Sequence, residues 1–184
     1  MLVRVIGCGN PHASDDAAGI VAVELARDEL DAIPGVEVLP VASPLDVVHH
    51  LDGADAVVVA DAIRTPGGRR SPGTLVRAVS GPDGLPAGIR SSLSSHGFGV
   101  VEAFGLVGAI GPLPRIVVVG VEIEQAAAGR PMSAAVRAAL PDLTACVVRE
   151  ARSLAAQAER ARTAGSSDPP RGDGPLTRSS TERS

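Results

Sequence analysis

The residues with the clearest chemical potential follow the first apolar run of the chain. Gly7, Gly9 and Asn10 form a glycine-rich turn, and two adjacent acids, Asp15 and Asp16, come shortly after it. A glycine turn between a strand and a helix usually offers backbone N–H groups to a phosphate. Because two carboxylates would repel that phosphate, the pattern favours a cation and leaves an anion site as the alternative.

Two further residues could join these acids in one site. Asp61 ends an otherwise apolar run, and His96 stands at the start of a predicted helix. In open α/β sheets, ligands bind beyond the carboxyl ends of the parallel strands, where we expect both residues to lie. Oxygen ligands with one imidazole nitrogen suit a divalent metal such as nickel, zinc, manganese or iron.

Each of these polar residues also has a purely structural interpretation. Asp15 is expected to cap a helix rather than bind a metal. Asp16, in the first turn of the same helix, would interact favourably with the positive end of the helix dipole. Asp61 could form an Asx-turn, and His96 could cap a helix. His12, in the same first loop, is a candidate for substrate contact.

The elements that must position these residues alternate along the chain. Apolar runs predict five strands, at 2–7, 36–41, 55–62, 74–80 and 115–122. Helices are expected from Ser14 or Asp15 to Ala26, from Ser43 to Leu51, from Ser94 or Ser95 to Leu106, and from Ser133 to about Arg162 with Pro141 interrupting or restarting it.

This order of elements predicts the fold class. It is typical of a three-layer αβα sandwich with a mostly parallel, about five-stranded twisted sheet. The fourth strand is expected to run antiparallel, because no helix separates it from the third. We expect one domain at residues 1–163 and a disordered tail rich in Ser, Pro, Gly and Arg at 164–184.

Composition excludes several classes of function. The net charge of −4 offers no electrostatic footprint for nucleic acid, and two phenylalanines are the only aromatic residues available for base stacking. The chain has no lysine, which excludes a P-loop lysine and Schiff-base chemistry. No signal peptide or membrane-spanning run is visible, so we expect a cytoplasmic protein with no membrane partner.

Four stretches, taken in order, resemble the hydrogenase maturation endopeptidases: GCGNPHASDDAAG, VVVADAIRTPG, SSHGFGVVEAFGL and VVVGVEI. The resemblance covers roughly residues 1–150. It departs from the family pattern at Ala17, where the family usually has glycine.

The resemblance implies an unusual, metal-dependent aspartic-type endopeptidase. Such a protein removes the C-terminal extension of a nickel-iron hydrogenase large subunit after nickel insertion. Nickel already held by the large subunit precursor is the recognition signal, so no tightly bound cofactor of its own is expected. Asp16, Asp61 and His96 match the family's metal-contact positions and would be the catalytic residues. We expect a monomer that acts on this one partner.

The sequence leaves the mechanism open. The metal could polarise the scissile carbonyl or supply hydroxide, or Asp16 or Asp61 could act as the general base on water. A serine mechanism with Ser94 or Ser95 beside His96 is possible on paper.

The alternative function is that of a non-enzymatic α/β module. It would bind a nucleotide or small anion through the turn formed by Gly7, Gly9 and Asn10. As a dinucleotide fingerprint this turn is poor, because His12 occupies the position of the third glycine.

Overall fold

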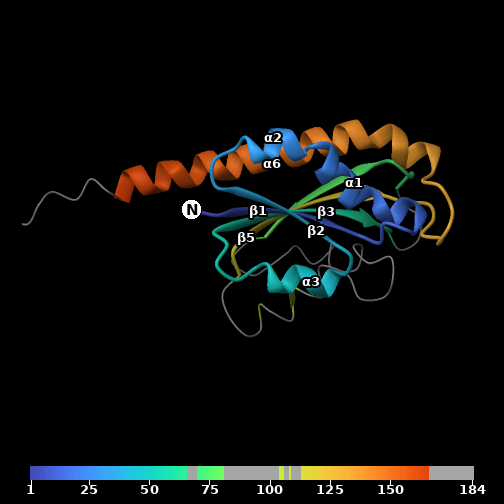
Figure 1. The fold of residues 1–184 in the computed structure, drawn as a ribbon, viewed down its shortest axis with the longest axis horizontal. Coiled ribbons are helices and arrows are strands. Elements are labelled where there is room, and N and C mark those ends of the chain that lie inside the picture. Colours follow the sequence, from blue (N-terminus) through green and yellow to red (C-terminus); the bar gives the residue numbers. More distant parts are fainter. Residues whose placement is uncertain (66–69, 81–103, 106–107, 109–112, 166–184) are drawn as a thin grey trace, which may run out of the picture.

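The structure, a computed structural model, describes residues 1–65, 70–80, 104–105, 108 and 113–165. Five strands form one sheet with helices on both faces (Figure 1). The elements in chain order are β1 (Val3–Cys8), η1 (Ser14–Ala17), α1 (Ala18–Leu25), α2 (Arg27–Asp31), β2 (Val36–Val41), α3 (Pro44–His49), β3 (Ala56–Ile63), β4 (Leu75–Val79), β5 (Arg115–Glu122) and α6 (Ala134–Gly165).

The sheet is mixed and mostly parallel, with the strand order β2-β1-β3-β5-β4. β1, β2, β3 and β5 run parallel, and β4 pairs with β5 in the antiparallel direction. β3 is buried at every position, because it lies in the middle of the sheet with cover on both faces. The predicted fold class and the antiparallel fourth strand are both confirmed.

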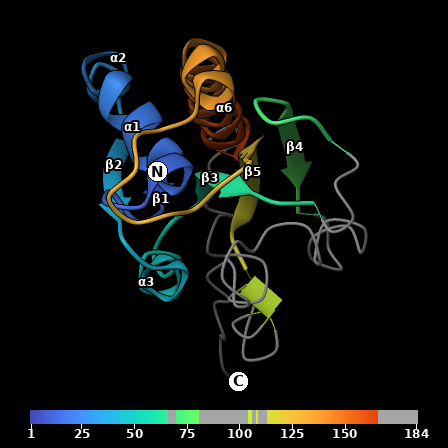
Figure 2. The same cartoon turned by 90° about the vertical axis from the view of Figure 1, so that its right-hand side faces the viewer.

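Two apolar clusters sandwich the sheet. On one face, residues such as Val58 and Ala60 of β3 pack against α1 and α6, for example against Leu143. On the other face, Val59 of β3 packs against α3 and against Phe104. Figure 2 shows α1, α2 and α6 on one side of the sheet and α3 on the other. The three predicted layers are therefore present.

The first predicted helix is divided into two pieces, and a further short helix follows them. It begins as the 3-10 turn η1, continues as α1, and is followed by α2, which the sequence did not predict. Ser43 caps α3 as predicted, since its Oγ accepts the N–H of Leu45 at 3.3 Å.

The prediction that Pro141 interrupts the last helix is wrong. α6 is assigned as one helix from Ala134 to Gly165, with Pro141 inside it. Proline removes one helical hydrogen bond, to the carbonyl of the residue four positions earlier. That residue is Arg137, and both Arg137 and Pro141 are exposed, so water can serve the carbonyl.

Part of the predicted organisation lies outside the described residues. This applies to His96, to Ser94 and Ser95 and most of the helix predicted there, and to residues 166–184 of the predicted tail. Residues 164 and 165 are the last two of α6. In the described part of the chain, no helix is both long and apolar enough to cross a membrane.

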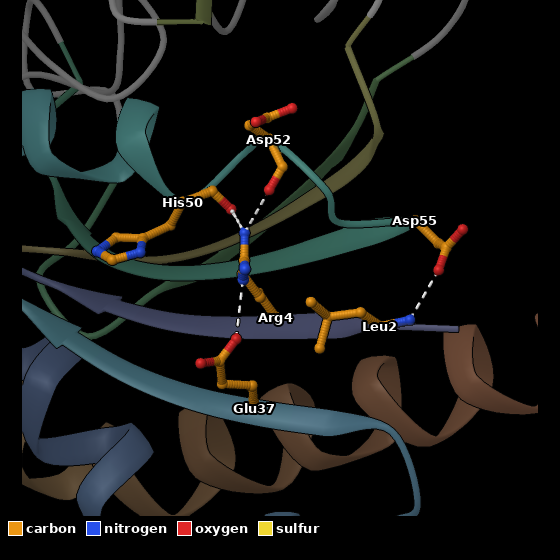
Figure 3. A network of polar contacts seen from close by, with 6 residues as sticks. All are labelled: Leu2, Arg4, Glu37, His50, Asp52 and Asp55. Carbon is orange, nitrogen blue, oxygen red and sulfur yellow. Dashed lines mark hydrogen bonds and ion pairs between the residues drawn. The ribbon is translucent and has the colours of Figure 1, made fainter.

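A polar network fixes the amino ends of the central strands (Figure 3). The guanidinium of Arg4 on β1 donates to the carbonyls of His50, at 2.9 Å, and Asp52, at 2.6 Å, which follow α3. The N–H of Leu2 donates to Asp55 just before β3, at 2.7 Å. These bonds hold α3 and β3 against β1 at the edge of the sheet opposite the polar site described next.

Candidate active site

The strand order places a reversal of winding direction between β1 and β3. From β1 the chain moves to β2 on one side and then returns to β3 on the other, so the direction of winding reverses there. Ligands of open α/β sheets bind at such a reversal. The loop carrying Asp16 follows β1, and Asp61 lies one position beyond Gly7–Ala60, the last pair of β1 with β3.

Gly9 lets the chain fold back over the end of β1. Its φ of 140° is disfavoured for residues with a side chain, and a Cβ there would collide with the backbone carbonyl of Asp16. The fold-back brings the N–H of Asn10 to Asp16 Oδ2 at 3.0 Å, while the N–H of Gly9 donates to the carbonyl of Val41 at 3.2 Å. The chain itself thus satisfies the two amides of the turn. This arrangement disfavours the alternative of a nucleotide or anion site, which would need these donors.

A second glycine brings the start of α1 directly onto the sheet. A Cβ on Gly19 would collide with the carbonyl oxygens of Ala60 on β3 and Cys8 on β1. α1 therefore begins in close contact with the backbone of the last residue of β1 and of Ala60 in β3. Because η1 leads directly into α1, this close approach also brings Asp16 near Asp61.

Asp61 is buried, and its environment favours the neutral acid. Burial raises the pKa of the Asp61 carboxyl well above its usual range, and the negative charge of Asp16 raises it further. A hydrogen bond with the backbone of Ala62 acts in the opposite direction. A cation between the two acids would remove both the repulsion and the proton, so the pair fits a divalent metal.

Cys8, the last residue of β1, lies close enough to both acids for their charges to act on its thiol. It is fully buried, and its thiol pKa is raised first by burial and then by the charges of Asp61, Asp16 and Asp46. The thiol therefore stays neutral and is neither a nucleophile nor a thiolate ligand. Cys8 therefore contributes packing to the site and no chemistry.

Asp15 has different hydrogen-bond partners from Asp16. It is fully buried, and its carboxylate accepts the N–H of Ser133 at 2.6 Å and of Gln125 at 3.4 Å. The expectation that Ser14 or Asp15 caps its own helix is wrong, because among the described contacts no side chain caps η1. Asp15 instead binds the N-cap residue of a remote helix, α6.

Glu122 is a buried acid that the sequence analysis missed. It ends β5, is 3% exposed, and accepts both the N–H and the hydroxyl hydrogen of Thr65 at 2.6 Å. Arg70 donates to the same Thr65 oxygen at 2.8 Å. These bonds fix the segment that follows Asp61. Its sequence signal is an acid at the end of an apolar run. The same kind of signal identified Asp61.

The structure thus brings together two of the three predicted site residues. Asp16 and Asp61 lie near each other, whereas His96 is outside the described residues. Within the described ranges, no group of three or more His, Cys, Asp or Glu side chains could hold a metal ion. His12, in the same loop as Asp16, is exposed, and its backbone N–H donates to Asn10 Oδ1 at 2.9 Å.

Comparison with known proteins gives the family. A family model described as HycI, hydrogenase maturation protease, matches residues 41–150. The chain belongs to the hydrogenase maturation protease family. The resemblance seen in the sequence is confirmed, and with it the expectation of an endopeptidase.

Solved structures agree with the protease fold. The hydrogenase maturating endopeptidase HybD from E. coli is 21% identical, with 83% of this chain and 93% of that chain covered and a TM-score of 0.65. HybD from Thermococcus kodakarensis, a [NiFe] hydrogenase maturation protease, is 23% identical over 84% of this chain and 99% of that one, with a TM-score of 0.61. A comparison with curated proteins gives no match.

The match to the protease family covers only part of the candidate site. It includes Asp61 and His96, whereas Asp16 and the turn at Gly9 precede the matched residues. For Asp16, the argument therefore depends on the geometry of the turn and on its charge beside Asp61.

Proposed function

We propose that this protease removes the C-terminal extension of a nickel-iron hydrogenase large subunit, and that nickel in the precursor signals readiness for cleavage. The observation that carries the proposal is the buried pair of Asp16 and Asp61, which two glycine contacts place where the winding of the sheet reverses between β1 and β3. Two acids that repel each other in a buried site are suited to a cation, and nickel is the cation that the precursor brings.

Asp16, Asp61 and His96 are the proposed nickel contacts and catalytic residues. The hydrogen bond from the Asn10 N–H orients the carboxylate of Asp16 before substrate arrives. This orientation reduces the reorganisation needed when the metal docks. The enzyme needs no tightly bound cofactor in this scheme, because the metal arrives with the substrate.

For the hydrolytic step we propose Asp61 as the general base. With a cation held between the two acids, the Asp61 carboxyl would be ionised and could therefore take a proton from water. The water oxygen attacks the scissile carbonyl carbon while Asp61 takes the water proton. That proton then passes to the departing amine as the C–N bond breaks. The large subunit precursor is the partner, and we propose that the enzyme acts on it as a cytoplasmic monomer.

Intact-mass spectrometry of the large subunit tests this function. The precursor is prepared with and without nickel, and each form is incubated with and without the protease. We expect shortening by the mass of one C-terminal peptide only when nickel and protease are both present. Shortening without the protease would overturn the assigned activity, whereas equal shortening of the nickel-free precursor would overturn nickel as the signal.

A further inference from the structure

Two neighbouring acids in the loop after β1 face different partners. Asp16 accepts the N–H of Asn10 and lies near Asp61, whereas Asp15 accepts the N–H groups of Ser133 and Gln125. A fully buried carboxylate is costly unless hydrogen bonds compensate it. The bond to Ser133, at 2.6 Å, has the short length of a charge-assisted hydrogen bond.

Asp15 is part of a longer junction between the loop after β1 and the segment that leads into α6. The hydroxyl of Ser14 donates to the carbonyl of Pro131 at 3.1 Å, and the N–H of Gly129 donates to the carbonyl of His12 at 3.1 Å. Residues 12, 14 and 15 are thus all tied to residues 125–133. These bonds fasten this part of the loop to the segment that leads into α6.

The backbone at Ser14 shows that the junction holds the loop in an uncommon conformation. Ser14 has a φ of 54°, in the left-handed region that costs a residue with a side chain about 1–2 kcal/mol. Such a conformation persists only where the surroundings determine it. Here the surroundings are the contacts of Ser14 with Pro131 and of Asp15 with Ser133.

We propose that Asp15 is a positioning residue for catalysis: it fixes η1 against the start of α6 so that Asp16 is held against Asp61. Asp15 itself touches neither nickel nor the scissile bond. Without its carboxylate, the N–H groups of Ser133 and Gln125 lose their acceptor and η1 loses its anchor. This inference rests on the proposed role of Asp16.

The test compares kcat and KM for Asp15→Ala, Asp15→Asn and the unaltered protease on nickel-loaded precursor. A displacement of about 1 Å at a reacting group costs on the order of 100-fold in rate. We therefore expect Asp15→Ala to lower kcat by about 10- to 100-fold and to raise KM as well, because Asp16 is a proposed nickel contact. Asp15→Asn keeps one acceptor oxygen, so its kcat is expected to lie between those of Asp15→Ala and the unaltered protease.

Two further variants separate positioning from stability. Leu143→Ala opens a cavity in the buried face of α6 and is expected to destabilise the fold while leaving kcat per folded molecule unchanged. Ser14→Ala removes only the bond to Pro131 and is expected to lower kcat by a smaller factor than Asp15→Ala. It still provides the test if Asp15→Ala does not fold.

The outcomes are distinguishable from a failure of the proposed function. If Asp16→Asn is inactive and Asp15→Asn and Ser14→Ala both keep the kcat of the unaltered protease, the positioning role is wrong and the assigned site stands. A loss of kcat in Leu143→Ala equal to that in Asp15→Ala would also contradict it. If Asp16→Asn retains full activity, the proposed function of the acid pair is wrong, and the positioning role that rests on it is wrong as well.

Discussion

The negative charge of Asp16 raises the pKa of the buried Asp61 carboxyl, so the two acids interact electrostatically where β1 and β3 end. Burial of Asp61 is the larger cause of the shift. A folded protein gains nothing in stability from this arrangement when no cation is present. Residues that break a general rule of stability in this way are commonly retained for function.

The first prediction concerns the stability of Asp61→Asn. The raised pKa means that the folded state keeps a proton on Asp61 at pH values where the unfolded chain, with its pKa near 3.8, has lost it. Stability from this group is therefore present at low pH and falls as pH rises through the folded-state pKa. Asparagine cannot ionise, so we expect Asp61→Asn to have a higher Tm than the unaltered protein at pH 8 and a smaller advantage at pH 4.

Thermal unfolding from pH 4 to pH 8 measures this effect. Asp28→Asn is the matched control, since Asp28 is exposed on α2 and its replacement should leave the pH profile unchanged. A Tm at pH 8 that is lower for Asp61→Asn than for the unaltered protein would contradict the assigned environment of Asp61.

The second prediction concerns the contact of Gly19 with the sheet. Gly19→Ala forces a methyl group against the carbonyl oxygens of Ala60 and Cys8, neither of which can move without disturbing its strand. We expect a loss of about 1–3 kcal/mol in unfolding free energy, as for other overpacked sites. Urea unfolding provides the measurement. Gly105→Ala is the control, because a Cβ there meets no atom of the described residues within 4 Å, and an equal loss in both variants would argue against the contact.

The third prediction concerns the ion pair that joins β4 to α6. Arg77 donates two hydrogen bonds to Glu150, at 2.8 and 2.9 Å, and this pairing lowers the pKa of Glu150. The resulting stability is present above the unfolded-state pKa of about 4.5 and is lost as pH falls through the lower folded-state pKa. Arg77→Met should therefore cost stability at pH 7 and much less at pH 3.

The size of that loss is set by the exposure of Arg77. Its side chain is 48% exposed, so water screens the pair, and we expect a cost of about 1 kcal/mol at pH 7. Urea unfolding at the two pH values checks both size and sign. A loss that grows toward pH 3 would show that the pair does not hold Glu150 in its ionised form.

The fourth prediction distinguishes the cation site from the anion alternative. ATP and NAD should leave the Tm unchanged, since Asp16 and Val41 already accept the N–H groups of the glycine turn. Nickel should raise the Tm of the unaltered protein, because binding adds about 2.7 kcal/mol to the free energy of unfolding at a nickel concentration of 100 times its Kd. The rise in Tm should be smaller for Asp16→Asn. Stabilisation by a nucleotide with none by nickel would support the module hypothesis instead.

The parts of the fold that the sequence predicted depend on local patterns. The run at β3 is apolar on both faces because the strand is central, and Asp61 stands out within it. Asp16 follows β1 and Asp61 lies near the carboxyl end of β3, and parallel strands end at the same edge of a sheet. Their proximity could therefore be expected before the structure was known.

The parts that could not be predicted depend on contacts between distant segments. The partner of Asp15 is Ser133, 118 positions away, and no local pattern encodes a bond at that separation. A helix cap was the reasonable local expectation for Asp15, and tertiary packing overrode it. The left-handed Ser14 has the same origin.

The most direct test of the account is cleavage of the nickel-loaded large subunit precursor by single-site variants, followed by intact-mass spectrometry. Asp16→Asn, Asp61→Asn and His96→Ala are each expected to leave the C-terminal extension in place, while the exposed-acid control Asp28→Asn removes it at the rate of the unaltered protease. A folded Asp16→Asn or Asp61→Asn variant that releases the extension at that same rate would contradict the claim that these two acids form the active site.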